Sequence, residues 1–231
     1  MGTGRQLEAK LDHMVGPSIE PSPAPAPLAS LWTGDLLGKM LNLLWRAYDE
    51  VCRTGIPEDR LDDENWLNQT LVDQMQMLAS RRDVFVVSNQ RMELSSRAGR
   101  RSPPPTSDIG FFLKARRECA LAAEAKLLHN SSHISKYVGK LRSHFLKGKY
   151  SPFCPAGIML GYLSLRDATW AFREIQKKLA TRLELDARFP RRSHRRSRHT
   201  RNLSGGRLGG IFDCHHLLFM FGKQGVQGEL L

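Results

Sequence analysis

The chain has 231 residues, of which 41% are hydrophobic, and its 35 Lys and Arg against 23 Asp and Glu give a net charge of +12. This hydrophobic content is enough for a folded core and excludes a wholly disordered chain. No uncharged apolar run approaches the roughly 18 residues of a transmembrane helix, so no membrane partner is expected. The four cysteines are far apart and form no CxxC pair, which predicts free thiols in the cytoplasm.

Charge is divided unevenly along the chain. Residues 1–80 hold 6 basic and 12 acidic side chains, whereas residues 81–231 hold 29 basic and 11 acidic. A basic segment of this length is typical of proteins that contact a polyanion, and nucleic acid is the simplest such partner. A solvated surface without a charged partner is the competing interpretation.

Apolar residues at helical spacing predict two helices in the first third of the chain. The first is expected over residues 35–53, and the second over residues 62–80 with Asp62 or Asp63 as its N-cap. Glu64 lies on the apolar stripe of the second helix. A carboxylate directed towards a core needs a partner or a function, because an unpaired buried charge is costly.

Alternation of β-like runs and helical segments follows. Strands are expected at 83–87 with a continuation at 90–94, then at 108–113, 119–128, 156–165 and 209–221, and helices at 132–147 and 167–183. Residues 188–201 carry seven arginines and two histidines without an apolar stripe, which predicts a loop or a mobile arm. This order predicts an α/β fold: a mixed sheet of about five strands flanked by helices, with an extra N-terminal helix.

Three charged residues interrupt the predicted strands. Asp108 begins one strand, and Glu124 and Lys126 lie in the next, within the otherwise apolar run ALAAEAKLL. Side chains alternate along a strand, so Glu124 and Lys126 share a face, and a short hairpin sets Asp108 beside them. Two carboxylates on adjacent strands can converge on a divalent ion, and a lysine can orient water. A surface ion pair on an edge strand is the alternative.

The pattern Asp108…Glu124-Ala125-Lys126, on a helix–strand–strand–strand–helix–strand scaffold, resembles the PD-(D/E)xK nuclease superfamily, which has the restriction-endonuclease-like fold. The resemblance implies a metal-dependent endonuclease that hydrolyses DNA phosphodiester bonds. It implies Asp108, Glu124 and the Ala125 carbonyl as ligands of Mg²⁺, for which Mn²⁺ can substitute. Lys126 would orient or activate the attacking water.

Further features belong to the same resemblance. Glu64 matches the acid that many members carry on the first core helix, whereas Ser107 replaces the proline of the motif. The partners expected are DNA, a second copy of the chain, and the components of a larger bacterial defence or mobile-element complex. The domain layout expected is a flexible arm at 1–30, an N-terminal helix at 31–61, the nuclease-like core at 62–221 and a tail at 222–231.

Basic side chains downstream of the motif are expected to contact phosphates. These are Lys136, Lys140, Lys147, Arg191, Arg192, Arg195, Arg196 and Arg198. Two other functions stay open: a noncatalytic nucleic-acid-binding subunit on the same fold, and a protein whose basic surface meets an acidic protein. Zinc is not expected at Cys214-His215-His216, because adjacent strand residues point to opposite faces.

Overall fold

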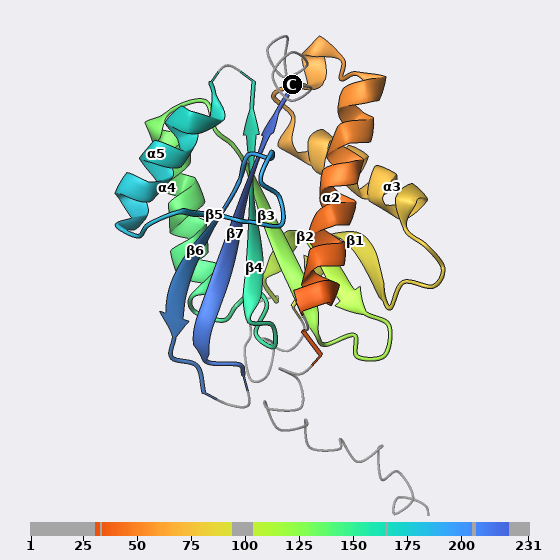
Figure 1. The fold of residues 1–231 in the computed structure, drawn as a ribbon, viewed down its shortest axis with the longest axis vertical. Helices are drawn as coiled ribbons and strands as arrows, with labels where there is room; N and C mark the ends of the chain where they lie inside the picture. Colours follow the sequence, from red (N-terminus) through yellow and green to blue (C-terminus); the bar gives the residue numbers. More distant parts are fainter. Residues whose placement is uncertain (1–30, 33, 94–103, 165, 205–206, 222–231) are drawn as a thin grey trace, which may run out of the picture.

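The computed structural model describes residues 31–32, 34–93, 104–164, 166–204 and 207–221. They form an α/β architecture in which helices cover both faces of one mixed sheet of seven strands (Figure 1). The predicted N-terminal arm and C-terminal tail lie outside the described residues. Among the helices of the described ranges, none is long and apolar enough to cross a membrane.

The sheet has the strand order β1-β2-β3-β4-β7-β6-β5. Its strands are β1 (Phe85–Met92), β2 (Thr106–Leu113), β3 (Ala120–Leu127), β4 (Ala156–Leu163), β5 (Glu184–Leu185), β6 (His194–Arg201) and β7 (Gly210–Met220). The central strands β3, β4 and β7 run parallel to one another, and every other neighbouring pair is antiparallel. The antiparallel strands β1, β2 and β3, followed by the parallel strands β4 and β7, therefore occur in the predicted order.

The prediction of about five strands is wrong by two, because the arginine-rich segment forms a strand. β6 pairs with β7 over eight residues, from His194 opposite Leu217 to Arg201 opposite Gly210. The short β5 then pairs with β6. Main-chain hydrogen bonds to β7 hold β6 in the sheet, although its sequence has no apolar alternation. Propensity rules fail here because the neighbouring strand supplies the stabilisation.

Four helices pack on the sheet, two on each face (Figure 1). They are α2 (Gly34–Thr54) and α3 (Glu64–Leu78) on one face, and α4 (Ser131–Lys140) and α5 (Ala168–Leu179) on the other. The Asp63 carboxylate caps α3 by accepting from Trp66 N at 3.0 Å, as the sequence predicts. The Asn130 side chain caps α4 by accepting from the backbone N–H groups of Ser132 and His133. Each N-cap satisfies backbone N–H groups that have no partner within the helix.

The segment after α4 departs from regular helix. The predicted helix to residue 147 ends at Lys140, and the chain continues as a π-helical turn, Leu141–Phe145. Phe145 packs against the central strand β4, where a Cβ on Gly157 would lie 2.5 Å from its ring. Glycine at this position therefore allows the turn to approach the sheet, and Lys140 lies at the junction.

Candidate active site

The site forms where β2 and β3 separate. Their pairing runs from Phe112 opposite Ala120 to Ile109 opposite Ala123. One residue beyond, Asp108 Oδ2 accepts a hydrogen bond from Ala125 N at 2.8 Å. A side-chain carboxylate thus takes the place of a main-chain acceptor, which fixes its position at the strand edge.

Glu124 is the most buried carboxylate of the site, with 2% of its side chain exposed. Its Oε1 lies 3.3 Å from Lys126 Nζ and 3.1 Å from Lys140 Nζ. Its Oε2 is buried and accepts no hydrogen bond from the residues that the structure describes. The neighbouring Tyr150 hydroxyl donates to Thr106 O at 2.6 Å, and burial together with the nearby Glu124 carboxylate raises the pKa of Tyr150. A buried carboxylate oxygen without a partner is costly, so this atom needs a ligand.

Lys126 joins the three carboxylates of the site. Its Nζ lies 2.7 Å from Glu64 Oε1, 3.3 Å from Glu124 Oε1 and 3.7 Å from Asp108 Oδ2, and it also contacts the Ala125 carbonyl. Glu64, at the first turn of α3, accepts from Leu127 N at 3.2 Å through its other oxygen. The acid that the sequence places on the apolar stripe of α3 therefore reaches the end of β3.

Burial and charge shift the acidity of two groups. The pKa of Asp108 rises to about 6, mainly because burial penalises its charge and further because Glu124 is negative. Burial acts to lower the pKa of Lys126, but Asp108, Glu124 and the hydrogen bond to Glu64 outweigh it and raise that pKa. The lysine is thus a permanent cation, and Asp108 takes up a proton in mild acid.

The oxygens present fit a hard divalent cation. Glu124 Oε2 has no hydrogen-bond partner among the described residues, and the hydrogen bond from Ala125 N goes to Asp108 Oδ2 rather than to Oδ1. Mg²⁺ prefers such carboxylate oxygens and is usually held by one or two of them together with water and substrate phosphate. The Ala125 carbonyl, the third predicted ligand, contacts Lys126. The structure therefore brings together all the predicted catalytic residues, Glu64 included.

The predicted phosphate-binding lysines fall into two groups. Lys140 reaches Glu124 and belongs to the site. Lys136 and Lys147 are exposed and form no ion pair with another described residue. These two remain candidates for contact with phosphate.

Most of the predicted phosphate-binding arginines have protein partners. Arg192 pairs with Asp49 at 2.7 Å, Arg196 and Arg198 both pair with Asp213, and the Arg195 guanidinium lies over the Phe172 ring. Arg191 is exposed. Charge density alone could not reveal this, because the paired acids come from α2 and β7. The arginine-rich segment is therefore held to the fold by ion pairs.

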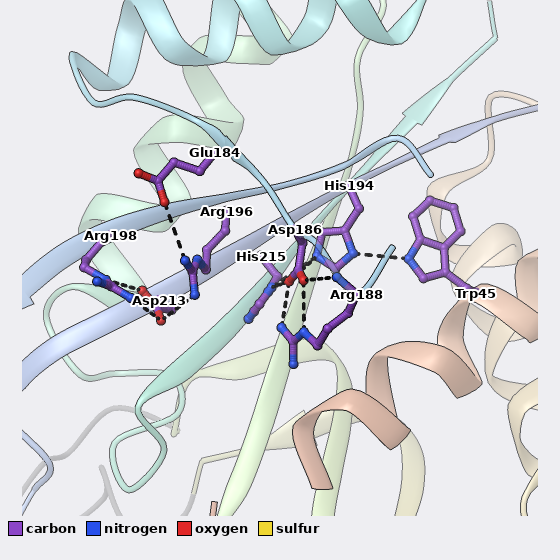
Figure 2. Close-up of polar contacts among 9 residues, drawn as sticks. All are labelled: Trp45, Glu184, Asp186, Arg188, His194, Arg196, Arg198, Asp213 and His215. Atoms are coloured by element: carbon purple, nitrogen blue, oxygen red, sulfur yellow. Dashed lines mark hydrogen bonds and ion pairs between the residues drawn. The ribbon is translucent and has the colours of Figure 1, made fainter. Parts of the chain in front are cut away.

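A second polar cluster, which the sequence does not predict, lies on the opposite face of the sheet. Glu124 pairs with Met159, whereas His215 pairs with Ile158, so their side chains point to opposite faces. His215 Nδ1 lies 3.1 Å from His194 Nε2 and 3.4 Å from Asp186 Oδ2. Figure 2 shows these three side chains pointing toward one another, with Arg188 beside Asp186 and Trp45 beyond His194. We call this set the Asp–His–His cluster.

The three ligand atoms of the Asp–His–His cluster are close enough together to hold a metal ion, but their hydrogen bonds favour protons. Trp45 Nε1 donates to His194 Nδ1 at 3.3 Å, which leaves the proton of the neutral ring on Nε2, the atom a metal would need. Arg188 binds Asp186 through two nitrogens at 2.9 and 2.6 Å. We therefore interpret the cluster as a hydrogen-bonded link between α2, β6 and β7.

Acidity in this cluster follows from its burial. Burial lowers the pKa of His194 to about 2 and also lowers the pKa of His215. Burial acts to raise the pKa of Asp186, but the neighbouring His215 and Arg188 side chains outweigh it and hold that pKa well below its usual range. Both rings are therefore neutral beside an ionised carboxylate at neutral pH.

In comparisons with models of known protein families, with characterised proteins and with solved structures, the chain gives no match. Its function is therefore argued from the geometry of its own residues. Sequence reasoning missed the role of Lys140 and the whole Asp–His–His cluster. The sequence feature that could have indicated the role of Lys140 is its place as the last residue of the amphipathic helix that follows the motif.

Proposed function

We propose that the chain is a metal-dependent nuclease that hydrolyses phosphodiester bonds of DNA. The observation that carries the proposal is the buried, unpartnered Oε2 of Glu124, next to Asp108 and within reach of Lys126. Two carboxylates that can hold a divalent ion, next to an ammonium group that can orient water, are the groups that metal-dependent hydrolysis requires. The restriction-endonuclease-like fold belongs to the same proposal, supported by the order of β1, β2, β3, α4 and β4.

Each residue has a distinct task in this mechanism. A bound Mg²⁺ would supply charge stabilisation at the scissile phosphate and lower the pKa of water. Asp108 and Glu124 would hold the ion through their open oxygens. Lys126 would hold the attacking water and stabilise the charge that develops on phosphate oxygens. Glu64 keeps the Lys126 ammonium in place at 2.7 Å.

DNA is the proposed substrate because positive charge remains near the site. Lys136 and Lys147 are exposed on and after α4, and the net charge of the whole chain is +12. Contacts with phosphate oxygens position a duplex without reading its sequence. A two-fold homodimer would bring two such sites to the two strands.

The test is cleavage of supercoiled plasmid with Mg²⁺ or Mn²⁺, compared with EDTA. Lys126→Gln and Asp108→Asn are the site variants, and Lys177→Gln on α5 is the control, which removes one exposed positive charge that is not among the proposed phosphate contacts. We expect metal-dependent nicking by the wild type and the control, and none by the site variants. Binding of plasmid and of single-stranded DNA and RNA without cleavage of any would overturn the proposal and favour a noncatalytic nucleic-acid-binding subunit.

A further inference from the structure

The ammonium group of Lys140 lies inside the carboxylate–lysine site, although Lys140 is not part of the motif formed by Asp108, Glu124 and Lys126. Its Nζ is 3.1 Å from Glu124 Oε1, the same oxygen that Lys126 approaches at 3.3 Å. Resting on the proposed function, we propose that Lys140 restricts this site to a single divalent cation. The lysine is then part of the metal-binding selectivity of the site rather than a phosphate contact on its rim.

The first argument is the count of open oxygens. Two-metal sites hold ions about 3.5–4 Å apart, and carboxylates commonly bridge them by giving one oxygen to each. Here Glu124 Oε1 faces two ammonium groups, which leaves Oε2 as its only open oxygen. Asp108 Oδ2 accepts from Ala125 N, which leaves Oδ1. Each carboxylate therefore offers one oxygen, enough for one shared ion and insufficient for a bridged pair.

The charges of the site also favour one divalent ion rather than two. Glu64, Asp108 and Glu124 carry three negative charges when ionised, and Lys126 and Lys140 carry two positive charges. The difference is one negative charge, which a single divalent ion together with one phosphodiester brings to neutrality. Without a phosphodiester, a second divalent ion would leave an excess of three positive charges in the wild-type site and of two in a site that lacks Lys140, so Lys140 makes the binding of a second ion less favourable.

The backbone holds Lys140 in this position. Lys140 is the last residue of α4, and the π-helical turn Leu141–Phe145 follows at once. Phe145 is fully buried against β4, so the junction is fixed to the sheet. Lys136 lies one turn earlier on the same helix, is exposed, and makes no ion pair with the described residues. It therefore provides a matched control for the loss of one lysine from α4.

The experiment counts bound Mn²⁺ on the full chain without DNA, by electron paramagnetic resonance of the free ion and by calorimetry at pH 8. The proteins are the wild type, Lys140→Gln, Lys136→Gln and Glu124→Gln, each checked for folding by circular dichroism. We expect one ion for the wild type and for Lys136→Gln, a second and weaker ion for Lys140→Gln, whose site carries one positive charge fewer, and none at this site for Glu124→Gln.

Other outcomes separate the two proposals. Two ions on the wild type, or a Lys140→Gln protein that still binds one, would overturn the restriction by Lys140 and leave the nuclease site standing. No ion on the wild type, with Glu124→Gln indistinguishable from it, would remove the basis of the proposed function itself.

Discussion

Glu124 of the carboxylate–lysine site and the Asp–His–His cluster lie on opposite faces of the same sheet, and both regions hold charged groups away from water. In the first, the buried oxygen Glu124 Oε2 has no hydrogen-bond partner among the described residues, and the pKa of Asp108 is raised to about 6. In the second, Arg188 holds both oxygens of Asp186 and His194 binds Trp45, and the buried atom without a partner among the described residues is a ring nitrogen, His215 Nε2. Open acceptors favour a ligand at the cost of stability, whereas paired ones favour stability alone. Burial of polar groups by itself therefore does not identify a functional site.

The largest expected effect tests the functional side of this comparison. Glu124→Gln should lower metal-dependent plasmid cleavage on the order of 10³-fold, because it removes the charge on the open oxygen that would hold the ion. Its unfolding temperature should fall, because Lys126 and Lys140 lose the buried charge with which they pair. Cleavage rates and thermal unfolding of the same preparations check both statements. Equal cleavage by the wild type and Glu124→Gln would show that the carboxylate–lysine site is not the functional one of the two regions.

Asp186→Asn is the counterpart on the structural side. Losing the charge that pairs with Arg188 at 2.6 Å should reduce the free energy of unfolding by about 3 kcal/mol. Metal-dependent cleavage per folded molecule should stay as in the wild type, because the cluster lies on the other face of the sheet. Urea unfolding, followed by cleavage assays well below the transition, provides the measurement. A cleavage defect in the folded variant would contradict the separation of the two regions.

Asp108→Asn should stabilise the protein when no divalent ion is present. The pKa of Asp108 is raised from 3.8 to about 6, so the folded state binds its proton more tightly than the unfolded state. That contribution is present below pH 3.8 and is lost as pH rises through 6. The variant should therefore exceed the wild type by about 2 kcal/mol at pH 8 in EDTA. The gain should vanish near pH 4, and urea titrations at both pH values test it.

The contribution of His194 to the free energy of unfolding should depend on pH in the opposite direction. Its pKa falls from 6.5 to about 2 in the folded state, so the unfolded state alone takes up a proton in mild acid. The stability of the wild type relative to His194→Gln is then fully present above pH 6.5. It should decrease by about 1.4 kcal/mol per pH unit below that value. A difference that is constant from pH 7 to pH 5 would show that His194 is protonated in the fold.

The smallest expected effect concerns metal binding by the Asp–His–His cluster. In a Glu124→Gln background, which removes the competing site, added Zn²⁺ should move the unfolding temperature by less than about 1 °C. The reason is that Trp45 keeps the proton of His194 on Nε2. A saturable rise that His215→Ala abolishes would reverse our interpretation and make the cluster a metal centre.

The sequence by itself determined the core of the candidate site. The period-two pattern of a strand puts Glu124 and Lys126 on one face, and a short hairpin aligns Asp108 with them. The helical stripe likewise marked Glu64 as a carboxylate in need of a partner, and the structure supplies Lys126. These predictions rest on local periodicity, which a sequence carries without reference to distant residues.

Only the tertiary structure decided the remaining features. Arginine-rich residues became β6 because β7 offered main-chain partners, and the arginine just before it, Arg192, is paired by an acid far away in the chain, Asp49. Lys140 turned from a presumed phosphate contact into a partner of Glu124, sixteen positions earlier. The Asp–His–His cluster likewise joins separate elements. Local patterns cannot specify such contacts, because they depend on how whole elements pack against one another.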